Sequence, residues 1–185
     1  MFRFHSRFRL AAALLAAPLV FSACSDDDDP TPDEENEQIT TVTYLLTPTT
    51  GGGAAVTATW RDTDGTGGNA PAIGSLGLRP NTTYTGSIVL LDETKSPVAD
   101  ITEEVEEESD EHLLVYASTP ASLLSITRTD RDSKNLEVGL ATQLVTNAAG
   151  TGSLRVTLRH QPVGKDGTAT PGDTDVEVTF PVTVQ

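Results

Sequence analysis

Cysteine is nearly absent from this chain of 185 residues, which contains only Cys24. A lone cysteine forms no disulfide within the chain and cannot build a cysteine metal site. Basic residues are also scarce, at 12 against 27 acidic residues. Because no basic surface is available to neutralise phosphates, nucleic acid is not expected as a partner, and anionic lipid headgroups are poor partners too.

Residue patterns typical of enzymes are missing as well. The chain has no Gly-Xaa-Ser-Xaa-Gly or Ser–His–Asp arrangement, no glycine-rich phosphate loop between a strand and a helix, and no pair of acids that stands out for glycoside hydrolysis. His112 closes an acidic stretch and His160 ends an expected strand, so we interpret both as solvated. Glu108 and His112 could share a helical face, but two ligands do not make a metal site. We therefore expect no enzyme.

The apolar run from Leu10 to Phe21 is short. A transmembrane helix needs about 20 apolar residues, which makes a membrane span the less favoured interpretation. Three arginines precede the run, and the small pair Ser22-Ala23 follows it. A positive segment, an apolar segment and a small-residue cleavage site together predict a secretory signal peptide over residues 1–23.

The segment Phe21-Ser22-Ala23-Cys24 resembles a bacterial lipobox. In lipobox proteins the cysteine is lipidated and becomes the new N-terminus, and it usually carries more than one acyl chain. Several acyl chains hold a protein stably on a membrane. The alternative is an ordinary signal peptide with a coincidental cysteine. The resemblance implies a lipid-anchored protein in which Cys24 is no longer a free thiol.

The residues directly after Cys24 are Ser25, Asp26, Asp27, Asp28 and Asp29. A serine and an acidic run at this position resemble the surface-export signal of Bacteroidota-type lipoproteins, which implies the outer membrane and an outward-facing protein. An acidic, proline-containing segment also makes a solvated tether. The two interpretations are compatible, and we expect residues 24–38 to be a lipidated acidic tether.

Acidic residues are concentrated in two segments. Removal of residues 1–23 leaves 9 basic and 27 acidic residues, a net charge of −18. Eight acids lie in the tether and eight lie between Asp100 and Glu111, whereas the remainder carries 11 acids against 9 bases. The folded body is therefore nearly neutral with two acidic segments, for which cations or a basic protein surface are the better partners.

From Ile39 onward, apolar and polar residues alternate with a period of two. The last segment shows it most clearly, with one face made of Val176, Val178, Phe180, Val182 and Val184. Such alternation is typical of half-buried antiparallel strands. Nine strands are predicted, near 39–47, 54–61, 73–78, 84–92, 112–117, 123–130, 136–145, 152–161 and 175–184. We expect residues 39–185 to have an all-β fold, a single antiparallel β-sandwich.

Two places depart from the plain strand pattern. Pro181 fits only an edge strand or a bulge, because proline donates no ladder hydrogen bond. In the acidic stretch, Asp100 and Glu103 could form a capping box, and Ile101 and Val105 share a helical face. A short acidic helix and an ordered loop are both open for this stretch.

The segment Leu78-Arg79-Pro80-Asn81-Thr82-Thr83-Tyr84 resembles the corner before a late strand in fibronectin type III domains, where a tyrosine hydroxyl bonds back to the backbone. Trp60, which closes an early strand, fits such a core. About 24 residues separate Trp60 from Tyr84, too few for the strands that usually lie between them. The resemblance therefore implies an immunoglobulin-like sandwich without its exact topology. Over the whole chain, the export signal, the Asp-rich turns, the acidic stretch 100–112 and the closing strand 175–184 together resemble Bacteroidota surface lipoproteins, which implies location and fold but no activity.

Three expected loops hold closely spaced acids or amides that could bind calcium, which prefers six to eight hard oxygen ligands. They contain Asp62, Asp64 and Asn69, then Asp130, Asp132 and Asn135, and finally Asp173 and Asp175. None has the spacing of an EF-hand. The same residue types are the ordinary choice in β-turns, so plain turns are the alternative. Calcium is the one cofactor that the sequence indicates.

The direction of successive strands places the longer loops. Because strands in a sandwich usually alternate direction, the loops 62–72, 93–111, 131–135 and 162–174 should share one end of the domain. That end would be long-looped and anionic, as recognition linked to cations needs. The tether reaches the first strand at the same end.

These observations together favour a non-catalytic lipoprotein that acts as a binding or structural module on the outer membrane, with an unknown protein or glycan as its ligand. The alternative is a calcium-dependent carbohydrate-binding accessory protein, and a small hydrolase ranks third. The aromatic residues after position 23 fall on expected inward or corner positions. We therefore expect them to pack in the core rather than to form an exposed sugar-binding surface. They are Tyr44, Trp60, Tyr84, Tyr116 and Phe180.

Overall fold

The strands of the computed structural model fall into two sheets of unequal width. The structure describes residues 37–49, 52–65 and 67–185. The expected signal peptide 1–23, the lipidation residue Cys24 and the export residues 25–29 lie outside the described residues. Within the described ranges, no helix is long and apolar enough to cross a membrane.

The larger sheet has seven strands in the order β3-β2-β1-β5-β9-β8, with β6 paired to β5 beside that path. These strands are β1 Thr41–Pro48, β2 Val56–Arg61, β3 Ala72–Ile73, β5 Thr83–Asp92, β6 Ala99–Asp100, β8 Leu124–Arg128 and β9 Ala141–Thr146. The smaller sheet has four strands in the order β4-β11-β10-β7. These are β4 Leu76–Leu78, β7 His112–Thr119, β10 Gly150–His160 and β11 Asp173–Val184. The pairing is antiparallel throughout, except that β4 runs parallel to β11.

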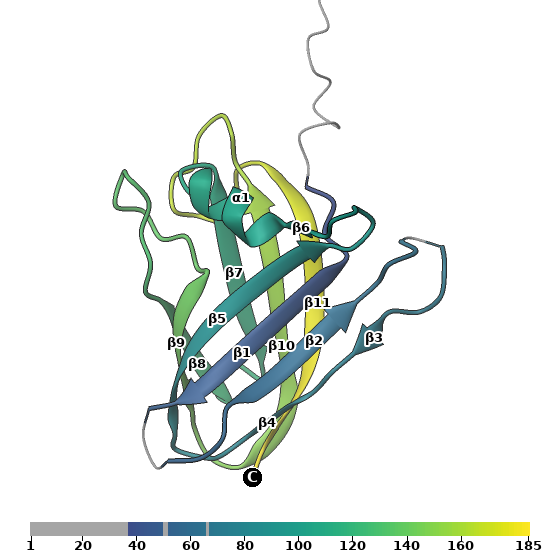
Figure 1. The fold of residues 1–185 in the computed structure, drawn as a ribbon. Helices are drawn as coiled ribbons and strands as arrows, with labels where there is room; N and C mark the ends of the chain where they lie inside the picture. The colour runs from purple at the N-terminus through teal and green to yellow at the C-terminus, as the bar shows by residue number, and fades with distance from the viewer. Residues whose placement is uncertain (1–36, 50–51, 66) are drawn as a thin grey trace, which may run out of the picture. The chain divides into compact units, whose positions relative to one another are not determined.

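One hydrophobic core lies between the two sheets, which face each other as two layers (Figure 1). The alternation read from the sequence has its predicted effect. Tyr44 of β1 and Tyr84 of β5 point inward from the larger sheet, and Phe180 of β11 points inward from the smaller sheet. Each of these rings is at most 2% exposed. The prediction of an all-β sandwich is confirmed.

The predicted strand 73–78 is two strands in the structure. β3 pairs with β2 in the larger sheet, whereas β4 pairs with β11 in the smaller sheet. The chain changes sheets at Gly74, whose N–H donates to the carbonyl of Thr59 at 2.8 Å. A Cβ at Gly74 would lie 3.0 Å from the backbone nitrogen of Thr59, so glycine suits this close approach.

The strand predicted at 136–145 corresponds to β9, which begins only at Ala141. The Asp130 carboxylate accepts hydrogen bonds from the N–H groups of Gly139 and Ala141, at 2.8 and 3.1 Å. These bonds take backbone donors that a strand ladder would otherwise use. Residues 129–140 are therefore a loop.

Pro181, for which the sequence allowed an edge strand or a bulge, lies in β11. At this residue β11 is paired with β10, opposite Ser153. The parallel pairing of β11 with β4 starts one residue later, at Val182. On the side of β11 that faces β4, Pro181 therefore lies just before the paired residues, where its missing N–H interrupts no hydrogen-bond ladder.

The acidic stretch contains a helix, α1 Ile101–Glu107. Asp100 caps its N-terminus, since the Asp100 carboxylate accepts a hydrogen bond from the Thr102 N–H at 3.0 Å. Ile101 and Val105 are buried against the core, as their shared helical face predicted. Of the two alternatives for this stretch, the short helix is the one that forms.

The corner before β5 has the tyrosine contact that the sequence indicated. The Tyr84 hydroxyl accepts a hydrogen bond from the Arg79 N–H at 2.9 Å. Tyr84→Phe removes this bond and keeps the ring. We expect the free energy of unfolding to fall by about 1 kcal/mol, the usual net contribution of one such bond. Chemical denaturation of the two proteins measures the difference, and equal midpoints would show that the bond adds nothing to the corner.

Candidate functional site at the long-looped end

The longer loops gather at one end of the sandwich, around α1 (Figure 1). Lys134 Nζ lies 3.1 Å from the Asp110 carboxylate, which ties the 129–140 loop to the turn after α1. Arg61, at the end of β2, pairs with Glu93 in the loop after β5. The prediction that these loops share one end is confirmed.

A buried ion pair holds the 161–172 loop at this end. The Lys165 ammonium lies 2.8 Å from Asp132 Oδ2, and both side chains are fully buried. The same ammonium donates to the Ser109 carbonyl at 2.8 Å. One lysine thus joins the 161–172 loop, the 129–140 loop and the turn after α1, so the loop end is a built surface rather than three separate loops.

The first predicted calcium loop brings Asp64 and Asn69 together. Asp64 Oδ2 accepts hydrogen bonds from the Asn69 N–H at 2.9 Å and from its Nδ2 at 2.6 Å. These bonds lower the pKa of the Asp64 carboxyl. Asp62 accepts a hydrogen bond from the Gly65 N–H at 2.9 Å. Both acids make short-range turn contacts, the alternative that the sequence left open for this loop.

In the second loop, Asp130 and Asp132 are both engaged with the backbone. Asp132 Oδ1 accepts from the N–H groups of Lys134 and Leu136, at 2.9 and 2.8 Å. Asn135 has a left-handed φ of 63°, a conformation that asparagine tolerates in turns. In the third loop, Asp173 is exposed and Asp175 is buried elsewhere, in the group described next. Calcium binding by these three loops stays a prediction.

His112 and His160 are buried, with 0% and 6% of their surface exposed, which corrects their interpretation as solvated. The two residues are direct cross-strand neighbours of β7 and β10. Their rings stack with centroids 4.7 Å apart and an angle of 5° between planes. His160 continues the inward face of Leu154 and Leu158, so the period of two already carried the signal for its burial.

Two carboxylates complete this group with the histidines. Glu37 Oε1 lies 3.0 Å from His112 Nε2, and Asp175 Oδ2 lies 3.9 Å from the same nitrogen. The Asp175 side chain is fully buried and that of Glu37 is 9% exposed. We call Glu37, His112, His160 and Asp175 the histidine–carboxylate cluster.

A β-bulge directs Asp175 into the cluster. In the pairing of β10 with β11, Leu158 is opposite Val176 and Arg159 is opposite Thr174, so Asp175 is the extra residue. A bulge breaks the alternation of the strand and re-aims the side chain of the extra residue. The sequence singled out Asp175 as a calcium candidate in a loop but did not indicate the bulge, because the residues of the bulge look like a continuation of the turn before it.

Electrostatics divide the cluster into one ion pair and one carboxylic acid. Burial disfavours the charged forms of Glu37 and His112, but their mutual hydrogen bond and charges outweigh it, so the pKa of Glu37 is lowered and that of His112 is raised. Burial, together with the nearby charge of Glu37, raises the pKa of Asp175 to about 8. These groups provide two nitrogen and two carboxylate ligands within one buried space.

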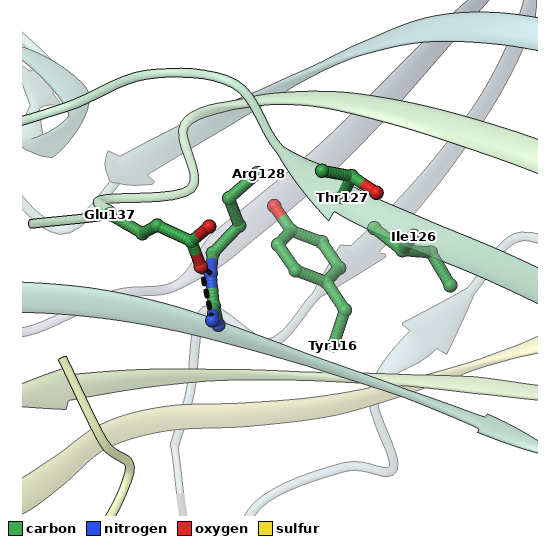
Figure 2. Close-up of a pocket in the computed structure, with 5 residues that line it drawn as sticks. All are labelled: Tyr116, Ile126, Thr127, Arg128 and Glu137. Carbon is green, nitrogen blue, oxygen red and sulfur yellow. Dashed lines mark hydrogen bonds and ion pairs between the residues drawn. The ribbon is translucent and has the colours of Figure 1, made fainter.

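A separate cavity of about 200 Å³ opens between β7 and β8 (Figure 2). It is lined by Tyr116, Ile126, Thr127, Arg128 and Glu137. Arg128 Nε donates to Glu137 Oε2 at 2.6 Å, and the Tyr116 hydroxyl donates to the Gly139 carbonyl at 2.6 Å. Burial raises the pKa of Tyr116 well above its usual value, so the phenol stays protonated. The polar groups of this cavity bind one another, which makes it a weaker candidate than the loop end.

Comparisons with known proteins find no match for this chain among family models, curated proteins or solved structures. The function is therefore inferred from the fold and from the residues described above.

Proposed function

We propose that the chain is a non-catalytic binding module, anchored by a lipid at Cys24 and exposed on the outer membrane, whose long-looped end holds a basic surface of a partner protein. The anchor and the location are carried by the lipobox-like segment and the acidic residues after it. The binding face is carried by the acidic surface of α1.

Five glutamates on and directly after α1 are exposed to solvent: Glu103, Glu104, Glu106, Glu107 and Glu108. None of them forms an ion pair with a base in the described part of the chain. Several of them are three or four residues apart, where like charges on a helix repel. A cationic partner would relieve this repulsion, and this unpaired acidic surface is the observation that carries the proposal.

The surface beside α1 is also shaped to receive side chains. A cavity of about 300 Å³ opens there, and Thr102, Glu106, Asp130 and Arg131 are among the residues that line it. The contacts of Lys134 and Lys165 fix the loops around it. A rigid acidic face loses little conformational entropy on binding, which favours recognition of a lysine- or arginine-rich surface.

The test compares two variants of equal charge. Glu103, Glu104, Glu106 and Glu107 are replaced by glutamine in the first, and Asp26, Asp27, Asp28 and Asp29 are replaced by asparagine in the second. The full chain, purified in detergent and immobilised, is offered the envelope proteins of the cells that make it. We expect the first variant to lose a partner that the wild type and the second variant retain, and we expect salt to weaken that binding.

The second variant is the control for net charge, because both variants lose four negative charges at different places. If the two variants retained the same partners as the wild type, the surface of α1 would not be the binding face. If both lost them equally, the attraction would depend on total charge alone and the proposal would fail.

A further inference from the structure

The histidine–carboxylate cluster contains polar atoms that the protein leaves without hydrogen-bond partners. Within the described residues, Glu37 Oε2 and both carboxyl oxygens of Asp175 have no such partner, and His112 Nε2 has none besides the Glu37 carboxylate. Buried polar atoms are normally paired, and a buried carboxyl group without a hydrogen-bond partner is costly. Since the Asp175 and His112 side chains have no exposed surface, solvent does not reach these atoms. A metal cation would satisfy these atoms, because it accepts lone pairs from several of them at once.

The ligand atoms are close enough together for one ion. One ligand atom from each of the four residues lies within 4.8 Å of the others. Zinc bonds of about 2.0–2.2 Å in a tetrahedron place neighbouring ligand atoms roughly 3.3–3.6 Å apart. The separations of His112 Nε2 from Glu37 and Asp175, 3.0 and 3.9 Å, lie on either side of that range. Shifts of a few tenths of an ångström would bring these two carboxylates to bonding positions.

The second nitrogen of His112 is held as in metal sites. His112 Nδ1 lies 3.1 Å from the carbonyl oxygen of Glu108, which can only accept a hydrogen bond. Nδ1 therefore carries the proton, and in the neutral ring the lone pair is on Nε2, which faces the carboxylates. A metal-binding histidine almost always donates its other N–H to a carbonyl or carboxylate in this manner.

We propose that Glu37, His112, His160 and Asp175 form a binding site for one divalent transition-metal ion, for which Zn²⁺ is the best fit. Two imidazole nitrogens and two carboxylates suit zinc, whereas calcium takes six to eight oxygens and disfavours nitrogen. Four protein ligands leave no open position, which is the pattern of a structural site rather than a catalytic one. The site is distinct from the α1 surface and does not depend on the proposed function.

Binding requires one movement inside the cluster. An imidazole lone pair lies in the plane of its ring, and the planes of His112 and His160 are parallel within 5°. One ion cannot lie in both planes, so the His160 ring turns about its Cβ–Cγ bond while Glu108 keeps the His112 ring in place. His160 Nε2 lies 3.7 Å from Glu111 Oε2, too far for a hydrogen bond, so the turn of the ring breaks no hydrogen bond between these two groups.

The bound ion would join four chain segments. Glu37 precedes β1, His112 begins β7, His160 ends β10, and Asp175 is in the bulge of β11. An ion at this point would fasten the start of the domain, where the tether enters, to the smaller sheet.

The experiment measures Zn²⁺ binding by the full chain, purified in detergent and treated with a chelator. Isothermal titration should show one tight site per chain, and Co²⁺ in its place should give the visible absorption bands of a four-coordinate ion with nitrogen ligands. Asp175→Asn and His112→Gln should each weaken Zn²⁺ by more than about 100-fold, because even residues that only orient a ligand contribute about 10–100-fold. The four-glutamine variant of α1 should bind Zn²⁺ as the wild type does.

Asp173→Asn is the matched control, since it removes an exposed carboxylate from the same strand two residues away and should leave Zn²⁺ affinity unchanged. If His112→Gln does not fold, Asp175→Asn, which keeps the shape of the side chain, decides the question. The proposal is overturned if the wild type has no tight site, or if Asp175→Asn and Asp173→Asn bind Zn²⁺ equally well. It is also overturned if Co²⁺ gives only the weak bands of an ion with six oxygen ligands.

Discussion

Lys165→Met is expected to lower the free energy of unfolding by about 3–5 kcal/mol, the usual consequence of removing one partner from a buried ion pair. The Lys165 ammonium and the Asp132 carboxylate are 2.8 Å apart and their side chains have no exposed surface. Methionine matches the length of the lysine stem but leaves the carboxylate charged and without its cation. Chemical denaturation of wild type and variant at neutral pH measures the loss.

A double variant separates two contributions to the loss of stability, the unpaired charge of Asp132 and the changed packing of the Lys165 side chain. Lys165→Met with Asp132→Asn has no buried charge, and asparagine keeps the Oδ1 acceptor for the N–H groups of Lys134 and Leu136. We expect the double variant to be more stable than Lys165→Met alone, because the unpaired charge is the largest part of the cost. A double variant that is as unstable as the sum of the two single variants would show that the pair is not coupled.

The pH dependence of Lys165→Met follows from the same pair. Burial opposes the ionisation of Asp132, but hydrogen bonds from Lys165 and from the backbone outweigh it and lower the pKa of the carboxyl. A carboxyl with a lowered pKa adds stability above its unfolded pKa of about 3.9 and loses it as the pH falls through the folded pKa. Without Lys165 the folded pKa rises, and protonation removes the unpaired charge. The stability difference between wild type and variant should therefore be smaller near pH 4 than near pH 7.

Most of the sandwich could be predicted from the sequence, because a strand with one buried face has an apolar residue at every second position. β11 shows this, with its inward residues from Val176 to Val184 separated by exposed or half-exposed ones. The split of the predicted strand 73–78 could not be predicted in the same way. Two or three residues are too few to show a period, and which sheet each half joins depends on contacts with Thr59 and Val182 that are distant in the sequence.

The histidine–carboxylate cluster escaped prediction for a related reason. Glu37 was counted as part of the tether and Asp175 as part of a loop, and neither has a local pattern that points inward. Their meeting with His112 depends on the register between β7 and β10 and on the bulge in β11. The acidic end was predicted correctly because it needs only the direction of successive strands, which does not depend on register.

Gly172→Ala is expected to be the most damaging change in the loop that leads into the bulge. Gly172 has φ of +72°, and a Cβ on it would overlap the carbonyl oxygen of His160. A left-handed conformation costs an ordinary residue about 1–2 kcal/mol, and forcing an atom into a filled space adds about 1–3 kcal/mol. We expect the free energy of unfolding to fall by about 2–5 kcal/mol in total, measured by the same denaturation experiment.

Gly164→Ala in the same loop is the matched control. Gly164 does not need a positive φ, and a Cβ there would meet no atom within 4 Å. Alanine at such a position usually leaves stability unchanged or raises it by up to about 1 kcal/mol, because the unfolded chain loses freedom. A large loss in Gly172→Ala with none in Gly164→Ala would locate the constraint at the contact with His160, the residue that brings its ring into the cluster. Equal effects would mean that the loop follows a different path and that the position of Asp175 in the bulge does not depend on this glycine.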